Sequence, residues 1–165
     1  MLRMKNGDYV PKGSGLETVS GSEAVLQRVL LRLTARRGAF PFMESFGSRL
    51  WTLGQLKAVE RQAAAEQYVA EALARSGVGS FVLVDDDKVC LTNINRQIIA
   101  TRKTVGQYKV EVMRDRILDI NPDAQVEVRK CFYLPENADE FDFTEYSYVV
   151  DAVDTVTAKI EIIMR

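Results

Sequence analysis

Residues 80–97 read SFVLVDDDKVCLTNINRQ and join a short apolar run to an acidic turn. The apolar run is bounded by Gly79 on one side and by three aspartates on the other, which predicts a buried strand. In an open α/β sheet, ligands bind beyond the carboxyl ends of the strands. The stretch therefore predicts an α/β sheet with a ligand site in the residues that follow this strand.

The residues after this stretch continue to alternate between helical and strand patterns. Residues 94–100 and the amphipathic residues 105–120 predict helices, and the second helix ends at the turn sequence NPD. Residues 125–132, QVEVRKCF, alternate as a strand does, and residues 148–150, YVV, predict another buried strand. Residues 155–165 predict a final helix. Strands that alternate with helices are typical of a parallel α/β sheet.

The residues before the acidic stretch have a mostly helical pattern. Residues 1–20 contain several Gly and Pro and few apolar side chains, so they predict a flexible lead-in. A helix is expected over residues 23–37, with Ser22 as its N-cap and Gly38 after its end. An aromatic loop then leads to an alanine-rich helix over residues 56–76.

The composition limits the classes of function. The chain has 165 residues, 22 basic and 23 acidic side chains, and a formal net charge of −1. It lacks histidine, which excludes histidine-dependent catalytic triads and histidine metal sites. Its two cysteines, Cys90 and Cys131, make no disulfide framework, and we expect both to pack as small buried side chains. The absence of a long apolar run or a secretory signal predicts a cytoplasmic protein without a membrane partner.

Carboxylates at two predicted strand ends are the first candidate site residues. Asp85 or Asp87 could accept a hydrogen bond from a nucleotide ribose, as acidic residues at strand ends do in dinucleotide-binding domains. Asp154 follows the strand predicted at residues 148–150, and its carboxylate could hold Mg²⁺ together with phosphate oxygens. The alternative is that three consecutive aspartates form only a solvated loop.

Three further polar side chains complete the candidate site. Asn93 and Arg96 follow the acidic turn, and the planar guanidinium group of an arginine matches phosphate oxygens. Lys109 lies in the next predicted helix and adds a positive charge. Together with the carboxylates, these side chains favour a nucleotide site.

These residues also carry a resemblance to a known family. Residues 82–128, VLVDDDKVCLTNINRQIIATRKTVGQYKVEVMRDRILDINPDAQVEV, followed by DAVDT at 151–155, resemble the ThiF/MoeB-type adenylating family, which is related to ubiquitin-activating enzymes. Residues 68–165 are similar to its tRNA threonylcarbamoyladenosine dehydratases, which use ATP to cyclise the threonylcarbamoyl group on a tRNA adenosine. The resemblance implies a Rossmann-like fold, ATP and Mg²⁺ as cofactors, and tRNA as a partner.

The resemblance also implies a role for each candidate residue, and these roles suit the chemistry. Adenylation builds negative charge on phosphate groups, which fixed cations and Mg²⁺ stabilise. The implied roles are ribose binding for Asp85, triphosphate contacts for Asn93 and Arg96, phosphate binding for Lys109, Mg²⁺ binding for Asp154, and catalysis for Arg96 and Asp154. Asp87 stays a candidate for nucleotide binding from its position after the strand alone.

One region departs from the family pattern. Family members begin with an apolar strand and a Gly-x-Gly-Gly-x-Gly-Ser loop, whereas residues 59–67 here read VERQAAAEQ. That loop supplies backbone N–H groups to phosphates at a helix N-terminus. Glu60 and Glu66 would repel phosphate there. We therefore expect an incomplete Rossmann-like parallel sheet that lacks its first strand, preceded by a helical segment, and an impaired ATP site.

The first part of the chain has a resemblance of its own. TARRG at 34–38 and FPFMESFGSRLW at 40–51 resemble the baseplate protein W-like family of tailed phages, over residues 15–74. The expected parts are a lead-in at 1–20, a baseplate-like segment at 21–67 and a partial ThiF-type domain at 68–165. The alternatives for function are therefore a structural baseplate component or a non-functional fusion of two truncated families. A conventional ThiF-type homodimer is not expected, because the N-terminal segment is replaced.

Overall fold

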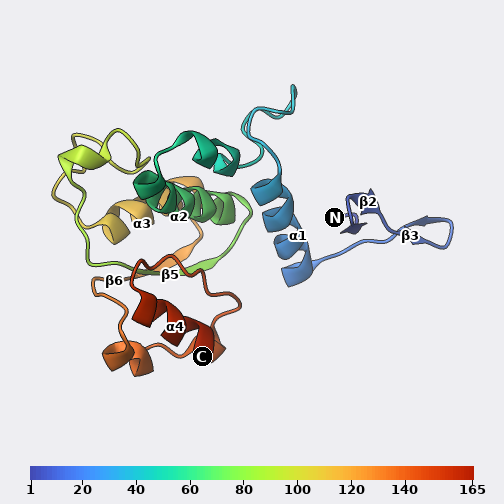
Figure 1. The fold of residues 1–165 in the computed structure, drawn as a ribbon. Coiled ribbons are helices and arrows are strands. Elements are labelled where there is room, and N and C mark those ends of the chain that lie inside the picture. The colour runs from blue at the N-terminus through green and yellow to red at the C-terminus, as the bar shows by residue number, and fades with distance from the viewer.

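The computed structural model describes residues 1–165, apart from the side chain of Val59 (Figure 1). Its centre is a parallel pair of strands, β5 (Ser80–Val84) and β6 (Gln125–Arg129), in register from Ser80 opposite Gln125 to Val84 opposite Arg129. Both strands were predicted from their sequence patterns, and the α/β class with a small parallel sheet is confirmed. The helices are α1 (Gly21–Thr34), α2 (Ala58–Arg75), α3 (Lys109–Ile120) and α4 (Val156–Met164).

Helices cover both faces of this sheet, as Figure 1 shows, with α2 and α3 on one side and α4 on the other. The first core packs Ile117 and Met113 of α3 against Ala74 of α2 and against Phe81 and Leu83 of β5. The second core includes Ala158 of α4 and the aromatic rings that follow β6. Two apolar layers on a parallel sheet are the arrangement that alternating strands and helices predict.

The strand predicted at residues 148–150 does not form. Tyr148, Val149 and Val150 are 70%, 44% and 55% exposed and belong to no strand. In the strand order 3-2-1-4, the first strand lies between the second and the fourth. Within the described residues, β5 pairs with β6 alone and its other edge has no partner strand. Residues 148–150 therefore lack the backbone ladder that would hold them extended.

The prediction of a helix at residues 94–100 is also wrong. A short 3-10 helix at Leu91–Asn93 is followed by turns. The backbone N–H groups of Ile98 and Ile99 donate to Oε1 of Gln67 on α2, at 2.6 and 3.4 Å. Because a long-range side chain takes these donors, they do not bond to carbonyls one helical turn earlier.

The N-terminal residues form two small antiparallel hairpins. Their strands are β1 (Met4–Lys5), β2 (Asp8–Tyr9), β3 (Pro11–Lys12) and β4 (Gly15–Leu16). Arg3 forms ion pairs with Glu17, directly after β4, and with Glu23 of α1, and so links the hairpins to that helix. The flexibility expected for residues 1–20 stays a prediction. The N-cap of α1 is Ser20 rather than the predicted Ser22. Both residues are serines, so the residue type alone could not show which of them precedes the helix.

A close backbone approach shapes the loop between α1 and α2. Ser48 N–H donates to Ala35 C=O at 2.9 Å, and Arg37 N–H donates to Ser48 C=O at 3.0 Å. Gly47, with a φ of +97°, makes this possible, because a Cβ atom there would meet Ala35 O at 2.6 Å. The loop is thereby held against the end of α1, and a 3-10 helix at Leu50–Gln55 leads on to α2.

Candidate functional site

The acidic turn after β5 is held by backbone bonds to two other elements. Asp85 N–H donates to Arg129 C=O at 3.2 Å, which extends the β5–β6 ladder by one residue. Asp87 N–H donates to Oδ1 of Asp85 at 2.9 Å, and Lys109 N–H donates to Asp87 C=O at 2.9 Å. These bonds place the first residue of α3 directly beside the turn.

Lys109 neutralises part of this turn. Its Nζ forms an ion pair with Asp87 and lies 3.8 Å from Oδ2 of Asp85. Burial acts to lower the pKa of Lys109, but the hydrogen bond to Asp87 and the nearby charge of Asp85 outweigh it and raise that pKa. Burial raises the pKa of Asp85, against the hydrogen bond from Asp87 and the charge of Lys109. The structure thus brings together Asp85, Asp87 and Lys109, as the sequence predicted.

The same turn contains a carboxylate cluster suited to a cation. One oxygen from each of Asp85, Asp86 and Asp87 lies within 4.8 Å of the others. Oδ1 of Asp86 is buried and has no hydrogen-bond partner among the described residues. An orphaned carboxylate oxygen beside two others fits a hard cation such as Mg²⁺. Sequence reasoning missed Asp86, although the run of three aspartates was the available signal.

Glu66 of α2 lies within electrostatic range of this cluster. Burial is the largest cause that raises the pKa of Glu66 to about 7, and the charges of Asp85 and Asp154 act in the same direction, against the hydrogen bond with Gln62 and the charge of Lys109. Asp154 itself is exposed and has no ion pair among the described side chains. Within the described residues, its contact with the site is limited to a weak electrostatic influence on Glu66, and its Mg²⁺ role stays a prediction. The sequence marked Glu66 only as a group that repels phosphate.

Asn93 and Arg96 are engaged in local contacts instead. Asn93 is buried, and its Oδ1 accepts a hydrogen bond from Cys90 N–H at 2.8 Å. The guanidinium group of Arg96 donates to Thr92 C=O at 2.5 Å and to Oδ1 of Asn95 at 3.2 Å. Neither side chain contacts the carboxylate cluster, so the structure does not bring these two predicted phosphate contacts together with Asp85 and Lys109. The expected burial of Cys90 is wrong. Cys90 is exposed, because it lies on the surface turn that also contains Asn93.

The position of the missing phosphate loop is occupied by helix. α2 runs without interruption from Ala58 to Arg75, so its N-terminus lies two turns before Glu66. Nε2 of Gln62 donates to Ala152 C=O at 2.7 Å, which ties α2 to the segment before Asp154. The site therefore offers several carboxylates and one lysine. These groups fit a ribose and a cation, and Lys109 is the one side chain that forms ion pairs with the turn in the described part of the chain, which has a helix where a glycine loop would offer backbone N–H groups to a triphosphate.

No helix among the described residues has both the length and the apolar character needed to cross a membrane.

Relatives of known activity match the second part of the chain. The tRNA threonylcarbamoyladenosine dehydratase of Escherichia coli is 49% identical over 96 residues, which are 58% of this chain and 36% of the relative. The enzyme of the same name from Bacillus subtilis is 50% identical over 95 residues, covering 58% and 37%. The chain thus spans little more than a third of the length of these curated relatives.

A solved structure of one such enzyme is similar in fold to the second part of this chain. The E. coli tRNA N6-threonylcarbamoyladenosine dehydratase in complex with ATP superimposes with a TM-score of 0.53 and 49% identity, over 57% of this chain and 39% of that one. The baseplate resemblance of residues 15–74 stays a prediction. The model of the ThiF family matches residues 67–164, more than half of the chain, and the protein therefore belongs to the ThiF family.

Proposed function

We propose that this chain carries the ribose-binding and cation-binding part of an ATP site from a tRNA threonylcarbamoyladenosine dehydratase, and that it binds Mg²⁺–ATP weakly. The observation that supports this proposal most strongly is the cluster of Asp85, Asp87 and Lys109 at the carboxyl end of β5. It lies where open α/β sheets bind nucleotides. A relative 49% identical to this chain was solved in complex with ATP.

Each group of the cluster has a distinct part in this proposal. Asp85 accepts hydrogen bonds from the ribose, Asp86 and Asp87 hold Mg²⁺ with Asp154 nearby, and Lys109 contacts a phosphate. Bound ATP supplies the adenylyl group by which this family activates its substrate. Because the site lacks a glycine loop, we propose that adenylation by this chain is impaired.

The substrate follows from the relatives rather than from the site. The matched enzymes are named for threonylcarbamoyladenosine in tRNA. We propose tRNA as the substrate of this chain also, which would place it in the cytoplasm. A symmetric ThiF-type homodimer is not expected, since helices and hairpins of another kind precede residue 67.

Calorimetric titration with Mg²⁺–ATP tests the proposal. The expected dissociation constant is weaker than about 100 μM, and Asp85→Asn should abolish the remaining heat. Asp123→Asn is the matched control, because Asp123 is an exposed carboxylate in the turn before β6. No detectable binding, or equal loss in both variants, would refute the nucleotide site, and a constant of about 1 μM or below would refute the missing phosphate contacts.

Arg96→Ala provides a second check of this geometry. Its guanidinium group is already bound to Thr92 and Asn95, so the substitution should change the affinity for Mg²⁺–ATP by less than about twofold. The same titration measures it. A tenfold loss would mean that Arg96 turns toward the phosphates when ATP binds.

A further inference from the structure

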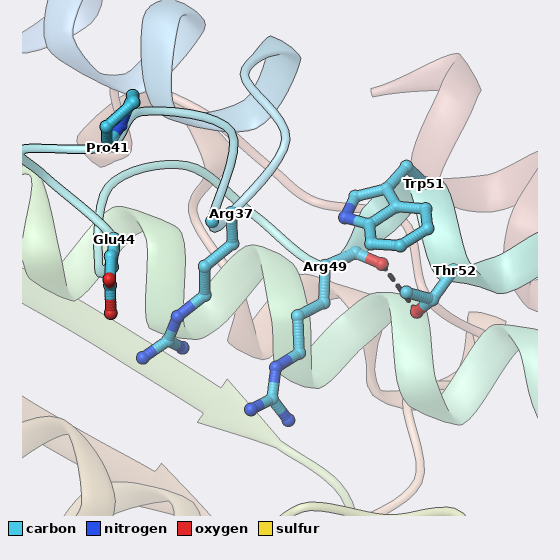
Figure 2. Close-up of a pocket in the computed structure, with 7 residues that line it drawn as sticks. Arg37, Pro41, Glu44, Arg49, Trp51 and Thr52 are labelled. Carbon is cyan, nitrogen blue, oxygen red and sulfur yellow. Dashed lines mark hydrogen bonds between the residues drawn. The ribbon is translucent and has the colours of Figure 1, made fainter.

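A groove combines positive charge with exposed aromatic rings. It is formed by residues that precede, in the sequence, those matched by the family model. It encloses about 530 Å³ beside the loop after α1, and its lining includes Arg37, Glu44, Arg49 and Trp51 (Figure 2). Volumes of this order accept ligands of the size of a nucleotide.

Two guanidinium groups extend into this groove side by side, as Figure 2 shows for Arg37 and Arg49. The backbone hydrogen bonds from Arg37 N–H to Ser48 C=O and from Ser48 N–H to Ala35 C=O fix the distance between their chain segments. Among the described residues, Arg49 has no ion-pair partner, and its side chain is exposed. The pair can therefore contact adjacent anionic groups without breaking strong contacts of Arg49.

The surroundings of this pair carry an excess of positive charge. Residues 24–57 contain six basic side chains and one acidic one, a net charge of +5. Buried Glu71 is shared by three arginines, at 2.6 Å from Arg116, 3.7 Å from Arg37 and 4.0 Å from Arg75. Burial and the charges of Arg75 and Arg49 lower the pKa of Arg37. An anion in the groove would relieve this repulsion.

Aromatic side chains lie beside the charges. Trp51 is 48% exposed, and the guanidinium carbon of Arg36 lies 5.8 Å from its ring centroid. Phe42, on the same loop, is 99% exposed. Nucleic-acid bases stack on aromatic rings and on arginine planes, while their phosphates bind guanidinium groups. An acidic protein segment would use the charges but leave the rings uncovered.

We propose that this groove binds single-stranded RNA, with phosphates on Arg37 and Arg49 and a base stacked against Trp51. Glu44 at the rim weakens the site and limits it to a short segment of the strand. The interaction does not depend on the nucleotide site, because every residue that lines the groove precedes residue 67.

Binding of a labelled single-stranded RNA of about 12 nucleotides to the full chain tests this proposal by fluorescence anisotropy. Arg49→Gln should weaken binding about tenfold and reduce the slope of log affinity against log salt by about 0.7. Arg102→Gln is the matched control, because it removes an equal charge from an exposed site elsewhere and should have a smaller effect. Glu44→Gln should tighten binding.

Trp51 supplies an independent readout, because it is the only tryptophan of the chain. RNA should quench its fluorescence, whereas inorganic tripolyphosphate should compete for the groove without quenching. Trp51→Leu should weaken RNA binding and leave tripolyphosphate binding unchanged. Equal losses in Arg49→Gln and Arg102→Gln, RNA binding without quenching, or equally tight binding of a polyglutamate peptide would each overturn the proposal.

Discussion

Glu66 lies on α2 and shares the electrostatic field of Asp85, Lys109 and Asp154. Its sequence neighbours are three alanines, and nothing in that pattern indicates a titratable site. The tertiary structure half-buries the Glu66 side chain and brings it within electrostatic range of Asp85. Its protonation is therefore a property of the fold and not of the local sequence.

This burial makes the free energy of unfolding depend on pH. The pKa of Glu66 is about 7 in the folded chain against an ordinary value of 4.5, so between these values the folded state holds more protons than the unfolded state. The free energy of unfolding should therefore fall as the pH rises through this window. Glu66→Gln should reduce that fall by about 1–2 kcal/mol after allowance for solvent screening.

Urea unfolding at the two ends of this pH window measures the effect. Glu145→Gln is the control, because Glu145 is exposed and outside the site. If Glu66→Gln and the parent chain lose stability in parallel, the carboxyl group of Glu66 is not buried in solution.

At the scale of the elements, the loop between α1 and α2 depends on Gly47. A side chain at this position would meet the backbone at Ala35, Arg36 and Arg37 at 2.6–2.8 Å, and the φ of +97° is strained for any other residue. Gly47→Ala should lower the free energy of unfolding by about 1–3 kcal/mol and displace Arg37.

A matched control exists on the following 3-10 helix. Gly54 has no heavy atom within 4 Å of an added Cβ and no left-handed φ, so Gly54→Ala should change stability by less than about 0.5 kcal/mol. Both variants are compared by urea unfolding. Equal stability in the two would show that the loop relaxes away from α1.

The central sheet makes a prediction for hydrogen exchange. β5 pairs with β6 on one edge only, so the amides of β5 that face β6, and the amide of Asp85, should be protected. The amides that face the open edge should exchange faster, and those of residues 148–150 should exchange as in an unfolded chain. Uniform strong protection of residues 81–84 and 148–150 would contradict a sheet of two strands.

At the scale of the whole molecule, we infer that one missing segment accounts for both the open sheet edge and the weak phosphate binding that we propose. We expect that replacing residues 55–67 by an apolar strand and a Gly-x-Gly-Gly-x-Gly-Ser loop will restore both. Hydrogen exchange should then show protection at residues 148–150, and calorimetry should show tighter binding of Mg²⁺–ATP.

A second graft separates the two effects. The same strand followed by a loop with alanines in place of its glycines should restore protection but not ATP binding, because the side chains block the approach of backbone N–H groups to phosphate. A first graft that restores neither property would show that the ThiF-type strand order does not describe this sheet.

The sequence by itself determined the elements that carry a strong periodic pattern. β5, β6, α3 and most of α2 lie where their patterns predicted, because a bounded apolar run or an alternation of side chains along a strand, and an apolar stripe along a helix, are local properties. The association of Asp85, Asp87 and Lys109 also followed, since residues after a strand and at the start of the next helix meet at one edge of a parallel sheet.

Only the tertiary structure decided the remaining features, because each depends on a distant partner. Residues 148–150 have a strand pattern but no neighbouring strand, and residues 94–100 lose their helix to the side chain of Gln67. Arg96 turns toward the backbone of Thr92, while Glu66 is half-buried within electrostatic range of Asp85. A pattern states which conformation a segment prefers, but backbone hydrogen bonds and burial determine whether it is adopted.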